Sequence, residues 1–268
     1  MPYSTRNGLK IHYDVHGEGP PLVLIHANPF DRRLWTYQVS RFSPFYKVIA
    51  IDLRGYGLSD KPDGAFTLRD MADDVLGVCA DEGVEKAIFA GVSVGSGIAL
   101  LIGTEEPEKA HAVILVGGSS DGPRDVESIV KGFEGKALGE YLMQLMRGYV
   151  APGFADTQLG GWLLRLFVEN AHTLNQTCIA NIFRARGSYD MTDRLADMTV
   201  PTLVINGEHD LSLAGGTKTA SLIPGAEHVI IKNTGHACCI EDPAGFDSAM
   251  IAFLRRNNLV PEGALRHG

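Results

Sequence analysis

The pentapeptide Gly91-Val92-Ser93-Val94-Gly95 places a serine between two glycines. It follows the apolar run 87–90 and precedes a helical pattern that starts at residue 94, so Ser93 is expected on a tight strand-to-helix turn. Such a turn lifts the hydroxyl clear of the sheet, and the N–H of Val94 then points to where an oxyanion would form. The pattern predicts a serine nucleophile for attack on a carbonyl carbon. The alternative is an ordinary glycine-rich turn with an incidental serine.

Two candidate partners for Ser93 follow predicted strands. Asp210 comes after the apolar run 202–205, and His236 comes after the run 228–231. Open α/β sheets bind and transform their ligands at the carboxyl ends of parallel strands, so both side chains are expected at the same edge as Ser93. Taken singly, an aspartate after a strand often caps a turn, and His236 is one of nine histidines.

Two other carboxylates compete with Asp210. Glu208 lies two residues before it, and Asp121 follows Gly117-Gly118-Ser119-Ser120 at the end of another predicted strand. The position of Asp210 after its strand favours it over Glu208. Both alternatives stay open from sequence alone.

Six unbroken apolar runs predict strands that are buried on both faces, as in a parallel sheet. They cover residues 22–25, 48–51, 87–90, 112–116, 202–205 and 228–231. Before them, Asn7-Gly8 between alternating apolar residues predicts an antiparallel hairpin. Helical patterns over 67–83, 94–106 and 243–255 alternate with the strands. The chain therefore predicts an α/β fold with a mostly parallel central sheet and helices on both faces.

Residues 120–190 interrupt this alternation with a long helical pattern that contains no convincing strand. The segment is too long for a single crossover between two strands. We expect it to form a helical cap over the ends of the sheet, inserted into a core made of residues 1–119 and 191–268.

Composition excludes several classes of protein. The 268 residues carry 24 Lys+Arg against 32 Asp+Glu, and this net charge of −8 disfavours nucleic acid and anionic membranes as partners. The apolar runs are far shorter than the ~20 residues that span a bilayer, and residues 1–6 lack the apolar segment of a signal peptide. The four cysteines match neither a zinc pattern nor a secreted disulfide framework; they are Cys79, Cys178, Cys238 and Cys239. We expect a cytoplasmic monomer or homodimer that acts on a small molecule without metal or cofactor.

Two further motifs complete a resemblance to a known family. Residues 24–29 (LIHANP) are similar to the H-G-x-P oxyanion loop of α/β-hydrolases, and residues 52–60 (DLRGYGLSD) resemble the D-x-R-G-x-G-x-S turn of that family. The loop 207–210 resembles its acid loop, and the order Ser, Asp, His is the order of its triad. The similarity extends over residues 9–256. The chain therefore resembles a capped α/β-hydrolase of the esterase, lactonase and C–C hydrolase group.

The resemblance implies a role for each matching residue. Ser93 would be the nucleophile, and His236 would act first as general base and then as general acid. Asp210 would hold the imidazole in one tautomer and stabilise its charged form. The backbone N–H groups of Asn28 and Val94 would form the oxyanion hole.

The oxyanion loop departs from the family pattern at one position. Ala27 stands where the family has glycine, and its methyl group is expected to contact substrate by narrowing the acyl pocket. Asn28-Pro29 resembles the loop of haloalkane dehalogenases, but those enzymes and epoxide hydrolases use an aspartate nucleophile. With a haloalkane or an epoxide, Ser93 would form an ether, which has no carbonyl group for water to attack. The serine therefore argues against dehalogenase and epoxide hydrolase activity. The Asn28 side chain either orients a polar substrate group or begins a turn.

The cap is expected to supply further substrate contacts. Trp162 is predicted to line the pocket, with core packing as the alternative. Arg184 is predicted to meet a substrate carboxylate, Arg186 is a second candidate, and solvated helix charges are the alternative. Cys238 and Cys239 are expected to pack as small apolar side chains, with a redox role or a vicinal disulfide as the alternative.

These expectations converge on a serine hydrolase that cleaves a small carboxylic ester or lactone through an acyl-enzyme. The same residues also suit hydrolytic C–C cleavage of a diketone-type substrate. A third hypothesis is a ligand-binding regulator on the hydrolase fold that does not turn over its ligand.

Overall fold

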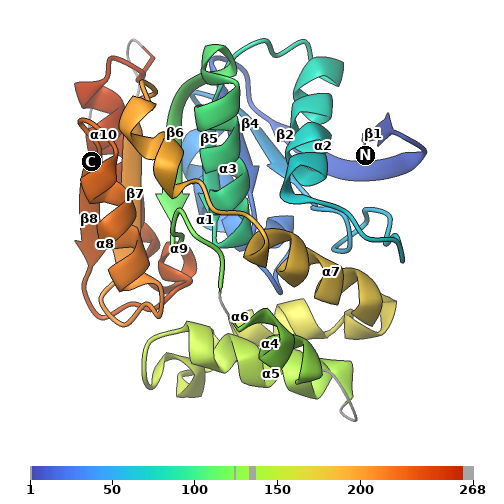
Figure 1. Cartoon of the computed structure of the whole chain (residues 1–268). Helices are drawn as coiled ribbons and strands as arrows, with labels where there is room; N and C mark the ends of the chain where they lie inside the picture. Colours follow the sequence, from blue (N-terminus) through green and yellow to red (C-terminus); the bar gives the residue numbers. More distant parts are fainter. Residues whose placement is uncertain (1, 124, 133–136, 262–268) are drawn as a thin grey trace.

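The computed structural model describes residues 2–123, 125–132 and 137–261 (Figure 1). A single eight-stranded sheet runs through it in the order β1-β2-β4-β3-β5-β6-β7-β8. The strands are β1 (Tyr3–Arg6), β2 (Leu9–His16), β3 (Pro21–Ile25), β4 (Lys47–Ile51), β5 (Ala87–Val92), β6 (Ala110–Val116), β7 (Thr202–Gly207) and β8 (Glu227–Ile231).

The sheet is parallel from β4 to β8, whereas β1 and β2 pair antiparallel with each other and β2 pairs antiparallel with β4. Asn7 and Gly8 have φ values of 48° and 81°, as the predicted hairpin turn requires. All six predicted apolar runs form strands. One expectation needs correction: β8, at the edge of the sheet, is not buried on both faces, because only Ile231 of its residues is buried and Ile230 is 48% exposed.

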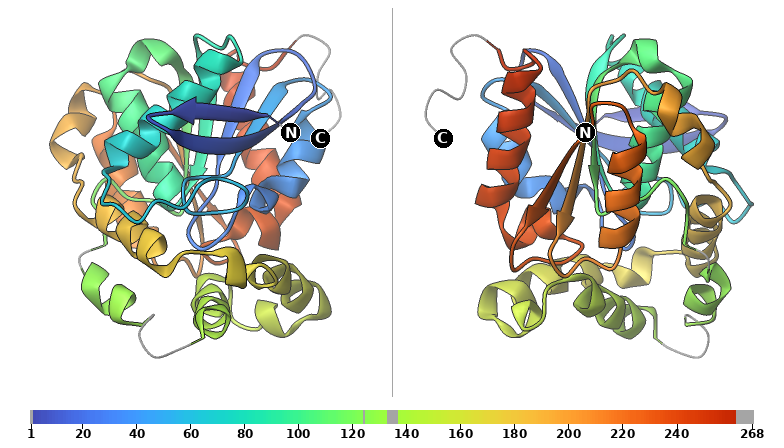
Figure 2. Two further views of the ribbon diagram at one scale, coloured as in Figure 1. Left: turned by 90° about the vertical axis from the view of Figure 1, so that its right-hand side faces the viewer. Right: turned by 60° about the vertical axis from the view of Figure 1, so that its left-hand side comes forward.

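Successive residues of the central strands point to opposite faces and supply two cores. Val23 and Ile25 face one core, whereas Leu22 and Leu24 face the other. Helices cover both faces (Figure 2): on one side α2 (Leu68–Asp81), α3 (Val94–Glu105) and α8 (Leu213–Leu222), and on the other α1 (Thr36–Phe42) and α10 (Pro243–Arg256). A capping box formed by Thr67 and Asp70 starts α2.

The described residues between β6 and β7 include four α-helices that lie beyond the carboxyl ends of the strands, below the sheet in Figures 1 and 2. They are α4 (Val126–Lys131), α5 (Leu138–Tyr149), α6 (Gln158–Val168) and α7 (Gln176–Gly187). An isolated β-bridge joins Asp121 to Asp190, so the two ends of this stretch meet. Positions 124 and 133–136 of the predicted cap are outside the described residues. In the described part of the chain, no helix is long and apolar enough to cross a membrane.

Candidate active site

Ser93 lies between the end of β5 and the start of α3, as the sequence predicts. Its φ of 55° and ψ of −110° fall in a region that L-residues rarely adopt. A Cβ on Gly91 would lie 2.0 Å from the Gly95 carbonyl oxygen, and one on Gly95 would lie 2.3 Å from the Ile25 carbonyl oxygen. Backbone packing therefore requires glycine at both positions, which explains the spacing of the motif.

The imidazole of His236 is hydrogen-bonded to the carboxylate of Asp210, with 2.8 Å between His236 Nδ1 and Asp210 Oδ1. The backbone N–H of His236 donates to the Tyr149 carbonyl at 2.7 Å, and the two rings lie 5.1 Å apart. Gly117 has a φ of 54°, and a Cβ there would lie 2.8 Å from Nδ1. These contacts fix the plane of the ring and leave Nε2 for another partner.

The carboxylate of Asp210 has no exposed side-chain surface and accepts several hydrogen bonds. Oδ1 accepts from the backbone N–H of Ser212 at 2.8 Å and from its hydroxyl at 2.9 Å, while Oδ2 accepts from Asn206 Nδ2 at 2.9 Å. Asn206 Oδ1 in turn lies 3.0 Å from His228 Nε2. Burial alone would raise the pKa of Asp210, but His236 and these donors lower it to about 2. Asp210 is therefore ionised at neutral pH.

Neither competing carboxylate is bonded to His236. Glu208 accepts a hydrogen bond from the backbone N–H of Asn233 at 3.0 Å. The backbone carbonyl of Asp121 accepts from Arg186 at 2.9 Å. The geometry thus favours Asp210 as the partner of the imidazole.

Asn28 and Val94 line one cavity of about 320 Å³ together with Ser93 and His236. Val94 contributes the first N–H of α3, and Asn28 follows the end of β3. No described residue accepts a hydrogen bond from either backbone N–H. Free N–H groups at a helix start are suited to bind a developing negative charge. The Asn28 Oδ1 atom is also buried and receives no hydrogen bond from a described residue.

The loop that carries Asn28 is held by His26. Its Nδ1 lies 2.9 Å from the Ala27 carbonyl oxygen, and its Nε2 accepts from the Leu53 N–H at 2.9 Å. Burial lowers the pKa of His26, which keeps the ring neutral, as the accepting Nε2 requires. Ala27 is fully buried in the core beside Phe30 and does not line the cavity. This corrects the expectation that its methyl group narrows the substrate pocket.

The buried carboxylate of Asp52 fixes the same loop from the other side. It accepts from the backbone N–H groups of Arg32 and Leu58, each at 3.0 Å, and from Arg32 Nη1 at 2.8 Å. His12 Nδ1 lies 3.1 Å away. Burial alone would raise the pKa of Asp52, but His12 and the two backbone donors help to lower it to about 2. A Cβ on Gly57 would lie 2.2 Å from this carboxylate, so the turn needs glycine there.

Replacing Asp52 with Asn is expected to lower the free energy of unfolding by about 3–5 kcal/mol, as removal of one partner from a buried ion pair does. The folded-state pKa of about 2 lies below the ~3.9 of an unfolded aspartate. The ionised carboxylate therefore makes its full contribution to the free energy of unfolding at pH values above the pKa of the unfolded state. This contribution is lost as the pH falls through the pKa of the folded state. Urea unfolding should show a large difference between the two proteins at pH 7 that shrinks in acid.

Asp73→Asn is the matched control, because Asp73 is exposed and pairs with Arg69 on the surface of α2. It should change the free energy of unfolding by at most about 1 kcal/mol. Equal losses in the two variants would contradict the role of Asp52.

Two predicted substrate contacts lie away from the Ser93 cavity. Trp162 is 52% exposed and does not line it. Arg184 is exposed, forms an ion pair with Glu127 at 2.9 Å and does not line the Ser93 cavity either. Arg186, two residues later on α7, is buried and does. The sequence held a signal for this difference, because 186 follows the apolar positions 179, 182 and 183 at helical spacing and 184 does not.

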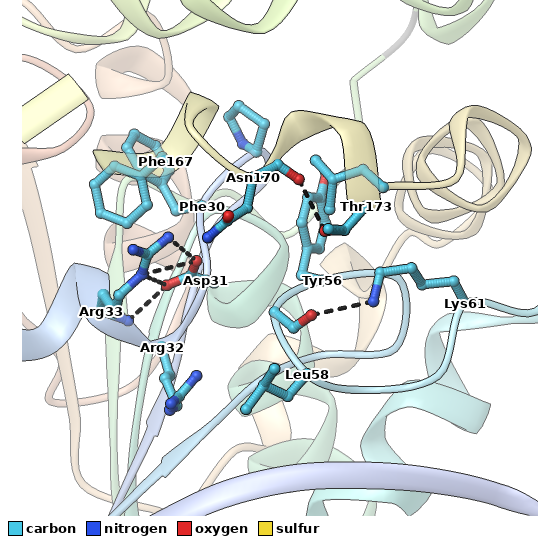
Figure 3. A pocket seen from close by; sticks show the side chains of 13 residues that line it. Phe30, Asp31, Arg32, Arg33, Tyr56, Leu58, Lys61, Phe167, Asn170 and Thr173 are labelled. Atoms are coloured by element: carbon cyan, nitrogen blue, oxygen red, sulfur yellow. Dashed lines mark hydrogen bonds and ion pairs between the residues drawn. The ribbon is translucent and has the colours of Figure 1, made fainter. Parts of the chain in front are cut away.

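A second cavity, of about 490 Å³, lies between residues 29–33, the turn 56–61 and residues 167–174 (Figure 3). It is larger than the Ser93 cavity, but the described residues that line it include no serine, histidine or cysteine. Its charged side chains already have partners: Arg33 pairs with Asp31 at 2.7 Å, and Lys61 Nζ donates to the Gly57 carbonyl at 3.1 Å, as Figure 3 shows. Because Ser93 lines the smaller cavity, we take that cavity as the candidate active site.

Cys238 and Cys239 are free thiols that follow His236 closely. Both are fully buried in the core, and burial raises the pKa of both thiols well above the usual value. They pack as small apolar side chains, as predicted. Within the described ranges, no group of three or more His, Cys, Asp or Glu side chains is placed to hold a metal ion.

Comparison with known proteins places this site in context. The sequence model described as "Alpha/beta hydrolase family" matches residues 22–249. A pimeloyl-[acyl-carrier protein] methyl ester esterase of Yersinia enterocolitica is 26% identical over 93% of this chain and 99% of its own. The crystal structure of an enol-lactonase from Burkholderia xenovorans LB400 superimposes with a TM-score of 0.88 at 24% identity, covering 95% of this chain and 100% of that one. Est816, described as an N-acyl homoserine lactone degrading enzyme, is 28% identical with a TM-score of 0.82, over 94% and 100% of the two chains.

Proposed function

Because the chain belongs to the alpha/beta hydrolase family, we propose that it is a serine hydrolase that cleaves a small carboxylic ester or lactone through an acyl-enzyme. The observation that carries the proposal is that Ser93 shares a cavity with His236, whose ring is bonded to Asp210. The esterase of Yersinia enterocolitica and the lactone-degrading Est816 support this substrate class.

In the first half of the reaction, the Ser93 hydroxyl attacks the carbonyl carbon while His236 Nε2 takes its proton. Asp210, ionised and bonded at Nδ1, stabilises the imidazolium that forms. The carbonyl oxygen gains negative charge and accepts hydrogen bonds from the N–H groups of Asn28 and Val94. Each such donor stabilises the transition state by about 2.7–4 kcal/mol in comparable sites. The imidazolium then protonates the leaving alkoxide, which departs from an ester and stays attached in an opened lactone.

In the second half, a water molecule attacks the acyl-enzyme carbonyl and His236 takes its proton. The oxyanion again lies against the N–H groups of Asn28 and Val94. When the tetrahedral intermediate collapses, Ser93 leaves and recovers its proton from the imidazolium. The cycle uses neither metal nor cofactor.

We also propose that residues 120–190 act as a cap on a core formed by residues 1–119 and 191–268. Tyr149, Phe183 and Arg186 from this segment line the Ser93 cavity, so it would shape the substrate site. We propose a cytoplasmic location and a monomer or homodimer as the working form. The four cysteines are free and buried, which is compatible with a reducing compartment.

A fluorophosphonate probe and a substrate panel test the proposal together. The probe should label Ser93, as read by mass spectrometry of the digested protein, because it phosphonylates an activated serine. The panel contains esters and lactones of increasing acyl length and a set of β-diketones. Turnover is expected for esters or lactones.

The other outcomes distinguish the alternatives. Cleavage of diketones without cleavage of esters would support C–C hydrolysis by the same residues. Labelling of Ser93 without turnover of any substrate would support a ligand-binding regulator. Absence of labelling at Ser93 would overturn the assignment of the nucleophile.

A further inference from the structure

Arg186 lines the Ser93 cavity, although the residue is only 6% exposed. It is the one Lys, Arg, Asp or Glu among the described residues that line this cavity. Its permanent positive charge therefore dominates the electrostatics of the wall. Any substrate group that binds against it meets a cation that is itself largely buried.

The hydrogen bonds of Arg186 are all to neutral acceptors. Nη2 donates to the carbonyls of Ser119 at 2.5 Å and Asp121 at 2.9 Å, and Nη1 reaches the Tyr189 carbonyl at 3.4 Å. The Nε–H donates to no described residue. Two of the five N–H donors that a guanidinium carries are firmly used, so hydrogen-bonding capacity remains.

No carboxylate oxygen of the described residues lies within ion-pair distance of Arg186. The side-chain carboxylates of Asp121 and Asp190 act on it through longer-range attraction, and burial lowers the pKa of Arg186 to about 10. The group is still cationic at neutral pH. A buried charge without an ion-pair partner is costly, and an anion bound against it would offset that cost.

The backbone of α3 makes room for this charge near the nucleophile. A Cβ on Gly97 would lie 2.7 Å from Arg186 Nε, so a side chain there would push the guanidinium away. Gly97 follows Ser93 by about one helical turn, and its N–H donates to the Ser93 carbonyl at 3.1 Å. The cation is thus held about one turn of helix from the serine.

We propose that Arg186 binds a carboxylate of the substrate, so that the ester or lactone cleaved at Ser93 is itself an anion. This inference rests on the proposed hydrolase function and narrows its substrate class. The carboxylate would accept hydrogen bonds from the N–H groups of Arg186 that have no acceptor. Charge-assisted hydrogen bonds of this type are strong. The competing explanation is that Arg186 only ties down residues 119–121 through their carbonyls.

Matched ester pairs test the inference. One pair is 4-nitrophenyl hydrogen adipate and its neutral methyl ester, with the charge on the acyl side. The other is 4-acetoxybenzoate and its methyl ester, with the charge on the leaving group. The wild-type protein should prefer the anion in at least one pair. Arg186→Gln should lower kcat/KM for that anion about ten- to a hundredfold, mainly through KM, with little change for the neutral ester. Arg186→Lys should keep part of the preference.

Arg184→Gln is the control, because Arg184 lies on the same helix but pairs with Glu127 at the surface. It should leave the ratio of kcat/KM between anion and neutral ester unchanged. Equal losses for both esters in Arg186→Gln would show a purely structural role and overturn the inference. So would a wild-type protein that cleaves the neutral esters and shows no preference for either anion, and in that case the hydrolase function stands. Cleavage of none of the four esters, without labelling of Ser93, would overturn the proposed function and this inference with it.

A measurement on the wild-type protein keeps the test decisive if the Arg186 variants do not fold. Adipate should inhibit ester hydrolysis competitively, and the neutral adipamide should inhibit at least about tenfold more weakly. Because ion pairing is screened by salt, inhibition by adipate should weaken as ionic strength rises. Equal inhibition by the two compounds would contradict a carboxylate site.

Discussion

Ser93→Ala is expected to lower kcat/KM for an activated ester such as 4-nitrophenyl butyrate by at least about 10⁴-fold. The variant removes the hydroxyl that forms the acyl-enzyme, and neither His236 nor the N–H groups of Asn28 and Val94 can replace it. Alanine keeps the Cβ at a φ of 55°, so the backbone of the turn does not gain or lose strain. Initial rates measured beside circular dichroism and the melting temperature separate loss of chemistry from loss of fold.

Ser96→Ala is the matched control for this experiment. Ser96 lies on the same helix, is buried, and does not line the Ser93 cavity. Activity in this variant should stay close to that of the wild-type protein. A Ser93→Ala protein that kept most of its activity would exclude the acyl-enzyme mechanism.

Asp210→Asn should lower kcat/KM by about 10⁴-fold, while the protein stays folded. The change removes the charge that stabilises the imidazolium of His236. An amide has only one acceptor oxygen, so it cannot satisfy His236, Ser212 and Asn206 together as the carboxylate does. Because the pKa of Asp210 is about 2, its charge is present throughout the neutral and mildly acidic range. The loss should therefore persist across that range and should not disappear at pH 5.

Glu208→Gln controls for a general effect of charge near the imidazole. Glu208 lies two residues before Asp210 in the sequence, and its carboxylate accepts a hydrogen bond from the backbone N–H of Asn233. We expect a change in kcat/KM of no more than about two- to threefold, because an exposed charge interacts only weakly with the site through water. A large loss in Glu208→Gln with a small loss in Asp210→Asn would reverse the assignment of the acid.

The sheet and the serine turn could be predicted because their signals are local in the sequence. An unbroken apolar run predicts a buried strand without any knowledge of its neighbours. Gly91 and Gly95 report backbone contacts that leave no room for a side chain, so the motif itself encodes the geometry of Ser93. Asp210 and His236 could be placed because strand ends in a parallel sheet share one edge.

The errors concern the direction in which a side chain points and what covers it. Ala27 was expected to face substrate, but it is buried in the core and the loop around it depends on His26 and Asp52. The sequence does not show the contacts of His26 with Leu53 and of Asp52 with Arg32, because they join segments that follow different strands. Arg184 and Arg186 differ in exposure because two residues on a helix point about 200° apart. The exposure of β8 follows from its place at the sheet edge, which strand-by-strand patterns do not reveal.

The bridge between Asp121 and Asp190 brings the two ends of the proposed cap together. The stretch between them leaves the sheet and returns to it at nearly the same point, so its ends are already closed. Closing a longer or shorter loop between fixed ends changes the entropic cost only slowly with length. A chimera that carries a relative's helices between these two residues is therefore expected to have different walls around the Ser93 cavity, while β6 and β7 keep their register.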